Sequence, residues 1–216
     1  MFLKFICRIT VFLIIVTSGL FADKFYINPY YLDKLQKDSK SYKIIKDYVR
    51  FLNSVKDEDD KTKINKVNLY INRILPRYDA YNYKNEEYWA TPFEFFSSAG
   101  GDCEDYVIAK MYSLKKLGFS EKIMYMSAVK EKYVGGDHMV LSLQIDKNSP
   151  PLVLDNLSMK VLPIDKRVDL KLMFMFNKNG FFKLNDYKKL INIDNKILPA
   201  YEKLRLKNKK ELIIKK

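Results

Sequence analysis

The order of the hydrophobic patterns along the chain restricts the folds that it can adopt. Apolar residues recur at helical spacing in the first half, over residues 30–56, 62–75 and 103–117. The second half instead holds short β-rich segments separated by turn residues, at 122–129, 138–145, 151–156, 173–176 and 181–184. Helices first and consecutive strands afterwards predict an α+β fold with an antiparallel sheet.

The first 22 residues have the layout of a secretory signal peptide. Lys4 and Arg8 form a basic start, residues 9–16 (ITVFLIIV) an apolar run, and residues 18–22 (SGLFA) a small-residue exit. The apolar run is shorter than the roughly 20 residues that a membrane-spanning helix needs, and an uncleaved anchor is the alternative. We therefore expect an exported protein with no stable membrane span once the signal peptide is removed.

Beyond the signal peptide (1–22), we expect an N-terminal helical segment (23–60), a core (61–190) and a basic C-terminal helix or tail (191–216). The net charge of the whole chain is +13, and residues 203–216 alone carry seven basic residues against one acid. No motif for binding RNA or DNA accompanies this charge. The composition therefore favours a solvated basic surface over nucleic-acid binding.

One cysteine, Cys103, remains once the signal peptide and its Cys7 are removed, so an internal disulfide is excluded. It stands in the sequence GGDCEDYVIAK, flanked by three acids, Asp102, Glu104 and Asp105. Negative charge nearby makes the reactive thiolate harder to form. Cys103 is therefore either an inert core residue or a nucleophile whose acidic neighbours are offset by something else.

The local pattern places Cys103 at the first position of a buried helix. Gly100 and Gly101 supply a tight turn before it, Asp102 is a good N-cap, and Gly118 is a natural stop. The first turn of a helix directs backbone N–H groups and the positive end of the dipole at such a side chain.

A base for this thiol can come from one residue only, because His138 is the single histidine. It begins the strand 138–145, out of phase with the apolar set that starts at Met139. Asp155 ends the next strand, and an antiparallel hairpin brings the start of one strand near the end of the next. Asp155 could then orient the imidazole. The alternatives are a structural or exposed histidine and an aspartate that only opens a turn.

Four motifs together resemble a known family, and they are W-x-T-P-x-E-F (89–95), GGDCEDYVIAK (100–110), HMVL (138–141) and PLVLDN (151–156). The chain resembles the bacterial transglutaminase-like cysteine proteinases, and within them the periplasmic adhesin-processing proteases of the LapG type. The resemblance covers residues 60–185. It implies a transglutaminase-like, papain-related core with extra N-terminal helices. It also implies that Cys103 is the nucleophile, His138 the general base and Asp155 the orienting acid.

The resemblance further implies a calcium-dependent endopeptidase in the periplasm. Its calcium ligands map to Asp102 and Glu104, with Asp105 as a third candidate. Its substrate is the N-terminal region of a large surface adhesin, whose cleavage releases cells from a biofilm. An inner-membrane receptor for cyclic di-GMP can sequester such a protease. The residues Gly135–Asp137 before the histidine depart from the family pattern and make its approach more flexible.

Three questions stay open at this stage. Trp89 either walls the site, with its indole N–H as a donor to the reaction, or serves as hydrophobic packing. The same three site residues would also suit a transglutaminase that transfers the acyl group to an amine. A third reading is a non-catalytic binding protein of the cell envelope that docks a partner through its acidic cluster and basic surface.

Overall fold

The computed structural model describes residues 24–77, 88–133, 135–186 and 188–215. The predicted signal peptide and the tyrosine-rich segment 78–87 lie outside the described residues. Within the described ranges, no helix combines the length and the apolar character that a membrane crossing requires.

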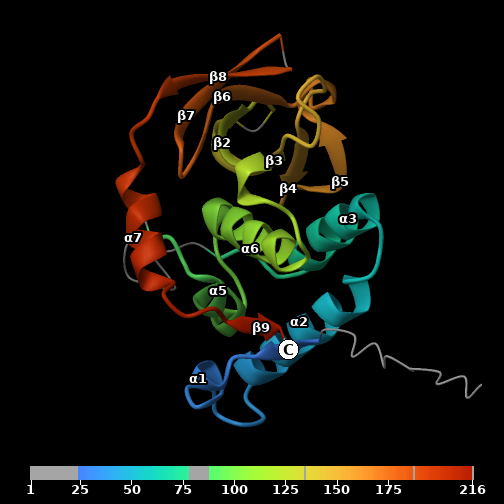
Figure 1. Cartoon of the computed structure of the whole chain (residues 1–216), viewed down its shortest axis with the longest axis vertical. Helices are drawn as coiled ribbons and strands as arrows, with labels where there is room; N and C mark the ends of the chain where they lie inside the picture. Colours follow the sequence, from blue (N-terminus) through green and yellow to red (C-terminus); the bar gives the residue numbers. More distant parts are fainter. Residues whose placement is uncertain (1–23, 78–87, 134, 187, 216) are drawn as a thin grey trace, which may run out of the picture.

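Seven strands of the second half form one antiparallel sheet in the order β5-β4-β3-β2-β6-β7-β8 (Figure 1). The strands are β2 (Met124–Glu131), β3 (Gly136–Leu143), β4 (Leu152–Asp155), β5 (Ser158–Pro163), β6 (Leu170–Asn177), β7 (Gly180–Asn185) and β8 (Lys189–Asp194). The predicted α+β class is therefore confirmed, with five of these strands at or near the predicted segments. The sequence patterns do not predict β5 and β8, because β5 follows β4 after only a two-residue turn and β8 has no buried face.

The helices precede this sheet, except for α7. They are α1 (Pro29–Leu32), α2 (Lys40–Val55), α3 (Asp60–Ile71), α5 (Pro92–Ser98), α6 (Cys103–Lys116) and α7 (Pro199–Lys207), with short 3-10 turns η1 (Glu121–Ile123) and η2 (Ile164–Lys166). Side-chain caps fix several starts: Ser39 accepts from the N–H of Tyr42, and Asp59 from that of Thr62. Asp59 lies in the charged segment KDEDDK (residues 56–61) between α2 and α3, so this segment supplies the cap of α3.

Helix α6 lies at the centre of the molecule, under the sheet, with α3 and α5 beside it (Figure 1). It packs mainly against β3 and also against β4 and β2. Leu141 and Leu143 of β3 are fully buried against this helical layer. Three residues of the apolar stripe predicted for α6, Val107, Leu114 and Leu117, are buried. The fourth, Met111, is half-buried, and the neighbouring Lys110 is buried instead.

The other face of the sheet carries a second, smaller hydrophobic cluster. It consists of Val129, Val140, Val153, Ile164 and Leu170. Strand β3 is therefore buried on both faces, through Leu141 on one side and Val140 on the other. A strand fixed from both sides gives its first residues a defined position, which matters because His138 is one of them.

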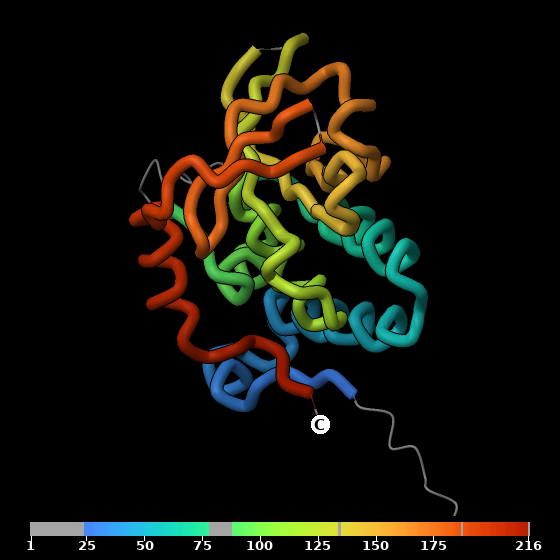
Figure 2. Tube along the Cα trace, turned by 45° about the horizontal axis from the view of Figure 1, so that its top comes forward, coloured from blue at the N-terminus to red at the C-terminus, as the bar shows by residue number. Residues whose placement is uncertain are grey.

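The two ends of the described chain meet on the side of the helical layer away from the sheet (Figure 2). Strand β1 (Phe25–Ile27) pairs antiparallel with β9 (Ile213–Lys215). Leu212 and Ile213 are buried in the main core, and the Ile213 N–H donates to the hydroxyl of Tyr112 on α6. The segment expected as a helix or tail thus contains α7 and a strand that closes the fold.

Shortening the buried side chain of Ile213 in β9 should destabilise the whole domain. We expect Ile213→Ala to lower the free energy of unfolding by roughly 2–5 kcal/mol, because it removes a fully buried side chain and leaves a cavity. Ile214→Ala, on a half-buried side chain of the same strand, is the matched control and should cost less than half as much. Urea unfolding of both variants measures this difference. Equal losses of unfolding free energy would show that Ile213 supports the core no more than the half-buried Ile214 does.

Candidate active site

The start of α6 is built so that Cys103 is its first residue. The carboxylate of Asp105 accepts a hydrogen bond from the backbone N–H of Ala90 at 2.7 Å and is fully buried. Gly101 lies against this side chain so closely that a Cβ would overlap it, which explains the glycine at this position. Asp105 therefore braces the loop before α5 to the first turn of α6, and its carboxylate faces inward.

The thiol of Cys103 is half-buried beside a carboxylate. Its Sγ lies 3.2 Å from Oε2 of Glu104, so the S–H donates to that oxygen. Burial raises the pKa of Cys103 to about 12, and the charge and hydrogen bond of Glu104 act in the same direction. A hydrogen bond from the backbone N–H of Met139 opposes them. With these partners alone, Cys103 stays a neutral thiol at physiological pH.

The residue before Met139 is His138, so the strand that contacts the thiol also carries the imidazole. The His138 Nε2 lies 2.8 Å from Oδ1 of Asp155, the last residue of β4. Both side chains are largely shielded from solvent, with 9% of His138 and 0% of Asp155 exposed. This contact uses Nε2 and leaves the Nδ1 of His138 for another partner. The structure thus brings His138 and Asp155 together beside the start of α6.

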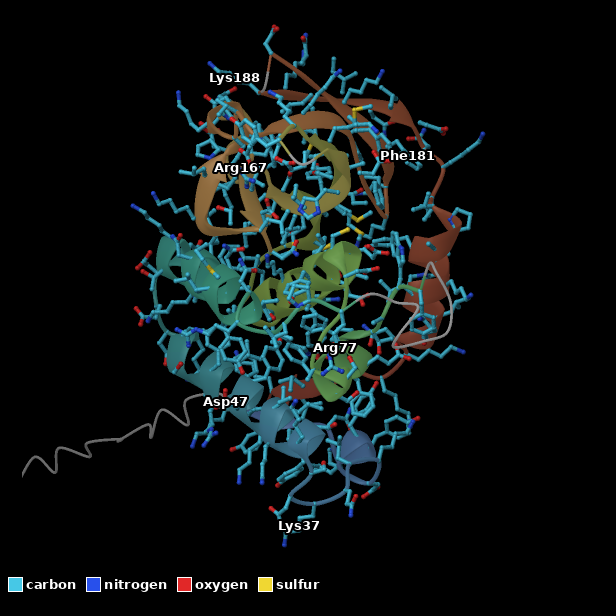
Figure 3. The ribbon with its side chains drawn as sticks, turned by 180° about the vertical axis from the view of Figure 1, so that it is seen from behind. Lys37, Asp47, Arg77, Arg167, Phe181 and Lys188 are labelled. Carbon is cyan, nitrogen blue, oxygen red and sulfur yellow. The ribbon has the colours of Figure 1, made fainter. Side chains whose placement is uncertain are left out.

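Arg167, in the connection between β5 and β6, holds the other oxygen of Asp155. Its Nη2 lies 2.6 Å from Oδ2 of Asp155, and the same guanidinium pairs with Asp169. Burial by itself raises the pKa of Asp155, but hydrogen bonds from His138, the Leu157 N–H and Arg167 lower it to about 2. Figure 3 places Arg167 in the sheet half of the molecule, away from the helical half that holds Asp47.

A second buried cation, Lys110, lies on α6 two turns after Cys103. It is only 1% exposed, and burial lowers its pKa to about 7 against the attraction of Asp155. The sequence reasoning identified neither Lys110 nor Arg167. Lys110 had a signal, because it stands at helical spacing between Val107 and Leu114 on the apolar stripe. Arg167 had only its two acidic neighbours in the sequence DKRVD.

The proposed calcium ligands are brought together only in part. Asp102 is the N-cap residue of α6, but its side chain makes no capping hydrogen bond to the helix. Glu104 lies at the thiol, whereas Asp105 is engaged by Ala90 in the interior. No three acidic, histidine or cysteine side chains converge as a metal site in the part of the chain that the structure describes. Calcium takes six to eight oxygen ligands, of which Asp102 and Glu104 would supply carboxylate oxygens if they held the ion.

Trp89 serves as packing in this structure. Its ring stacks on Phe176 of β6 with 6.2 Å between centroids, and its carbonyl accepts a hydrogen bond from Lys207 of α7. The residue nevertheless lies close to the site along the chain, because Ala90 is the next residue and is bound to Asp105. Trp89 therefore links the sheet, α7 and the start of α6.

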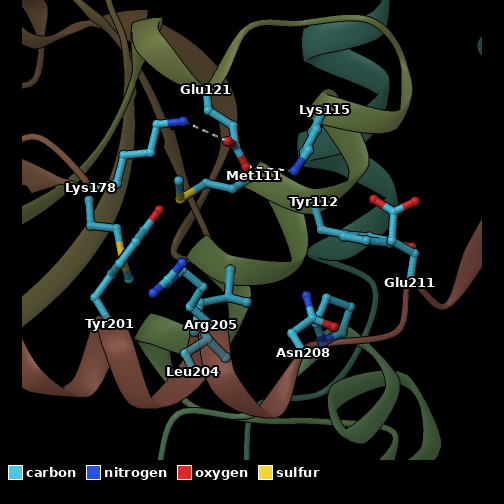
Figure 4. A pocket seen from close by; sticks show the side chains of 13 residues that line it. Met111, Tyr112, Lys115, Glu121, Lys178, Tyr201, Leu204, Arg205, Asn208 and Glu211 are labelled. Atoms are coloured by element: carbon cyan, nitrogen blue, oxygen red, sulfur yellow. Dashed lines mark hydrogen bonds and ion pairs between the residues drawn. The ribbon is translucent and has the colours of Figure 1, made fainter.

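Two of the cavities among the described residues lie near α6 or the sheet and differ in their lining. The larger, of about 760 Å³, has His138 and Asp155 in its wall. The smaller, of about 360 Å³, lies between α6 and α7, where Lys115 and Lys178 both reach Glu121 (Figure 4). None of the predicted site residues lines this smaller cavity, so it is separate from the candidate active site.

The hydrogen bonds of Asp155 predict that the free energy of unfolding decreases at acidic pH. Its pKa is lower in the folded state, about 2, than the ordinary 3.8, so its contribution is complete above pH 4 and is lost as the pH falls through 2. We expect about 2 kcal/mol of stability to disappear over this range. Unfolding free energies of the wild type and Asp155→Asn between pH 5 and 2 measure it. Equal pH slopes in the two proteins would contradict the buried ion pair.

Comparisons with known proteins show which solved structures share this fold and which family the chain matches. Three structures of Legionella pneumophila LapG match the fold, one in calcium-bound and one in EGTA-treated form. The calcium-bound form has a TM-score of 0.69 at 26% identity over 83% of this chain and 96% of the other. The EGTA-treated form has a TM-score of 0.70 at 28% identity over 82% of this chain and 94% of the other.

No curated protein matches the chain. Residues 41–171 match the family described as bacterial transglutaminase-like cysteine proteinase BTLCP, so the chain belongs to this family of cysteine proteases.

Proposed function

We propose that this protein is a calcium-dependent cysteine endopeptidase of the periplasm, with Cys103 as nucleophile, His138 as general base and Asp155 as the residue that orients the imidazole. The observation that carries the proposal is the buried His138–Asp155 contact of 2.8 Å. It lies one residue from Met139, whose N–H reaches the thiol. This arrangement gives a cysteine protease its base and its orienting acid.

The reaction follows from the free nitrogen of His138. Nδ1 takes the proton of Cys103, and the thiolate attacks the carbonyl carbon of a peptide bond. Cys103 is the first residue of α6, where backbone N–H groups have no acceptor within the helix, so its N–H is a candidate donor to the oxyanion. The imidazolium then gives its proton to the leaving amine. Water, deprotonated by His138, attacks the thioester and releases the carboxylic acid with the thiol restored.

Calcium dependence is supported by the acids that flank the thiol. Asp102 and Glu104 would hold the ion, and its positive charge, when present, would offset the charge of Glu104 that disfavours the thiolate. Asp105 is a poor ligand in this arrangement because Ala90 occupies its carboxylate. The calcium-bound form of the Legionella pneumophila relative supports the same proposal.

The substrate and partner in this proposal come from the family resemblance. We infer that the protease cleaves the N-terminal region of a large surface adhesin and so promotes detachment from a biofilm. An inner-membrane receptor for cyclic di-GMP would sequester it. Export through the signal peptide at residues 1–22 would bring the enzyme into the compartment that holds both proteins.

Replacing the thiol tests the reaction directly. We expect Cys103→Ala to abolish cleavage of the N-terminal segment of a co-encoded large adhesin while binding to that segment persists, because the thiol forms the acyl-enzyme. Product formation followed by mass spectrometry measures this. Cleavage by Cys103→Ala would refute the site assignment. Incorporation of a labelled primary amine without net cleavage would favour the acyl transferase, and binding without any turnover by the wild type a non-catalytic protein.

The reactivity of the thiol tests the role proposed for calcium without any substrate. We expect iodoacetamide to label Cys103 slowly at pH 7.5 in chelator. Calcium should speed labelling about tenfold or more, since each unit by which the pKa falls multiplies the thiolate fraction tenfold.

Two variants sharpen this measurement. Glu104→Gln should speed labelling in chelator, because it removes the charge beside the thiol, and it should respond less to calcium. Asp57→Asn, in the turn between α2 and α3, is the control and should behave as the wild type. A labelling rate that calcium leaves unchanged would remove the ion from the account.

A further inference from the structure

The larger cavity is lined by His138 and Asp155 of the candidate site. The rest of its wall comes from the ends of β2 and β3, the β4–β5 turn, β5 and the connection from β5 to β6. Cys103 is not part of this wall. A volume of about 760 Å³ is large enough for several side chains of a bound peptide.

The chemistry of the reaction decides which part of a substrate meets this cavity. Cys103 bonds to the acyl side of the cleaved peptide bond, whereas His138 must approach the nitrogen on the leaving side to protonate it. The residues that follow the cleaved bond therefore run past His138. A cavity that opens at His138 and excludes Cys103 is in the place that this leaving segment would take.

The carboxylates in the wall are already engaged within the protein. Four acids line the cavity, and each has a cation or backbone N–H groups as partner. The partners are Arg167 for Asp155 and Asp169, Lys130 for Asp137, and the N–H groups of Tyr133 and Gly135 for Glu131. One guanidinium serves both Asp155 and Asp169, so these carboxylates are hydrogen-bonded within the protein while their negative charge is balanced only in part.

The two lysines of the wall are in a different situation. Lys160, exposed on β5, has no hydrogen bond or ion pair through its ammonium group among the described residues. Lys166, in η2, has only an exposed contact of 3.7 Å with Asp165. Exposed contacts of this kind are weak and are readily exchanged for a better partner. The ammonium groups of Lys160 and Lys166 are therefore the charged groups of this wall that an acidic ligand meets with the least competition.

We propose that this cavity binds the segment of the polypeptide substrate that follows the cleaved bond and that Lys160 and Lys166 select acidic side chains in that segment. The proposal rests on the proposed function, because it needs His138 as the proton donor to the leaving amine. It assigns specificity to the leaving side of the substrate, at residues that neither form the acyl-enzyme nor orient the imidazole.

The experiment uses a synthetic library of random-sequence peptides, with every new terminus identified by mass spectrometry. Three proteins are compared in calcium: the wild type, Lys160→Glu with Lys166→Glu, and the control Lys183→Glu with Lys189→Glu on β7 and β8. Both double variants make the same change of charge on exposed lysines, in β5 and η2 for the first and in β7 and β8 for the control. Thermal unfolding and the rate of Cys103 alkylation verify that fold and thiol are unaffected.

We expect the Lys160→Glu, Lys166→Glu variant to lose the preference for acidic residues after the cleaved bond by about 3- to 10-fold, the scale of one or two exposed ion pairs. Its preferences before the bond should match the wild type, and the control should match it on both sides. A change confined to residues before the bond, or no change, would overturn the cavity assignment while cleavage itself upholds the proposed function. Absence of any cleavage by the wild type would overturn both.

Discussion

The candidate site depends on one buried carboxylate and its hydrogen-bond partners. Asp155 is completely shielded from solvent, and an isolated charge in that position would be costly. His138 and the N–H of Leu157 bind one of its oxygens and Arg167 the other, and these contacts together favour its ionised form. The surrounding structure supports this arrangement. The small cluster around Val140 and Ile164 fixes β3 on one side and the connection that carries Arg167 on the other.

The sequence predicts those parts of the molecule that repeat or that have local signals. Helix α6 begins at the predicted residue because a glycine pair and an acid precede the cysteine. The contact between His138 and Asp155 is predicted because two short strands joined by a turn must lie antiparallel. The predicted class of fold is also correct, since it needs only the order of helical and strand patterns.

Other features have no local signal. Arg167 reaches Asp155 through the path of a connection between strands, and no periodicity describes such a path. The pairing of β1 with β9 joins three-residue strands from opposite ends of the chain, and segments of this length carry no pattern. Asp105 looks like a neighbour of Glu104 in the sequence, yet the helix turns its side chain inward to Ala90. Adjacent residues on a helix point in different directions, which sequence adjacency alone does not reveal.

The thiol and the imidazole occupy contrasting surroundings. Burial and Glu104 raise the pKa of Cys103, so a positive charge beside the thiol would favour its reactive thiolate. His138, by contrast, is already hydrogen-bonded to the carboxylate of Asp155. The proposed calcium ligands lie beside the thiol, and the proposed substrate cavity opens at His138. In this proposal, His138 lies between the calcium ligands that would activate the thiol and the cavity that would bind the leaving segment of the substrate.

The proposal that Cys103 forms a covalent acyl-enzyme is tested most directly by identifying the reaction intermediate. The protein is mixed with substrate in calcium and ¹⁸O-labelled water, quenched in acid during turnover, and analysed by mass spectrometry. If Cys103 is the nucleophile, we expect a transient thioester between Cys103 and the N-terminal fragment of the substrate. We also expect ¹⁸O in the new carboxyl group. Cleavage that proceeds with no adduct on Cys103 would contradict the proposal.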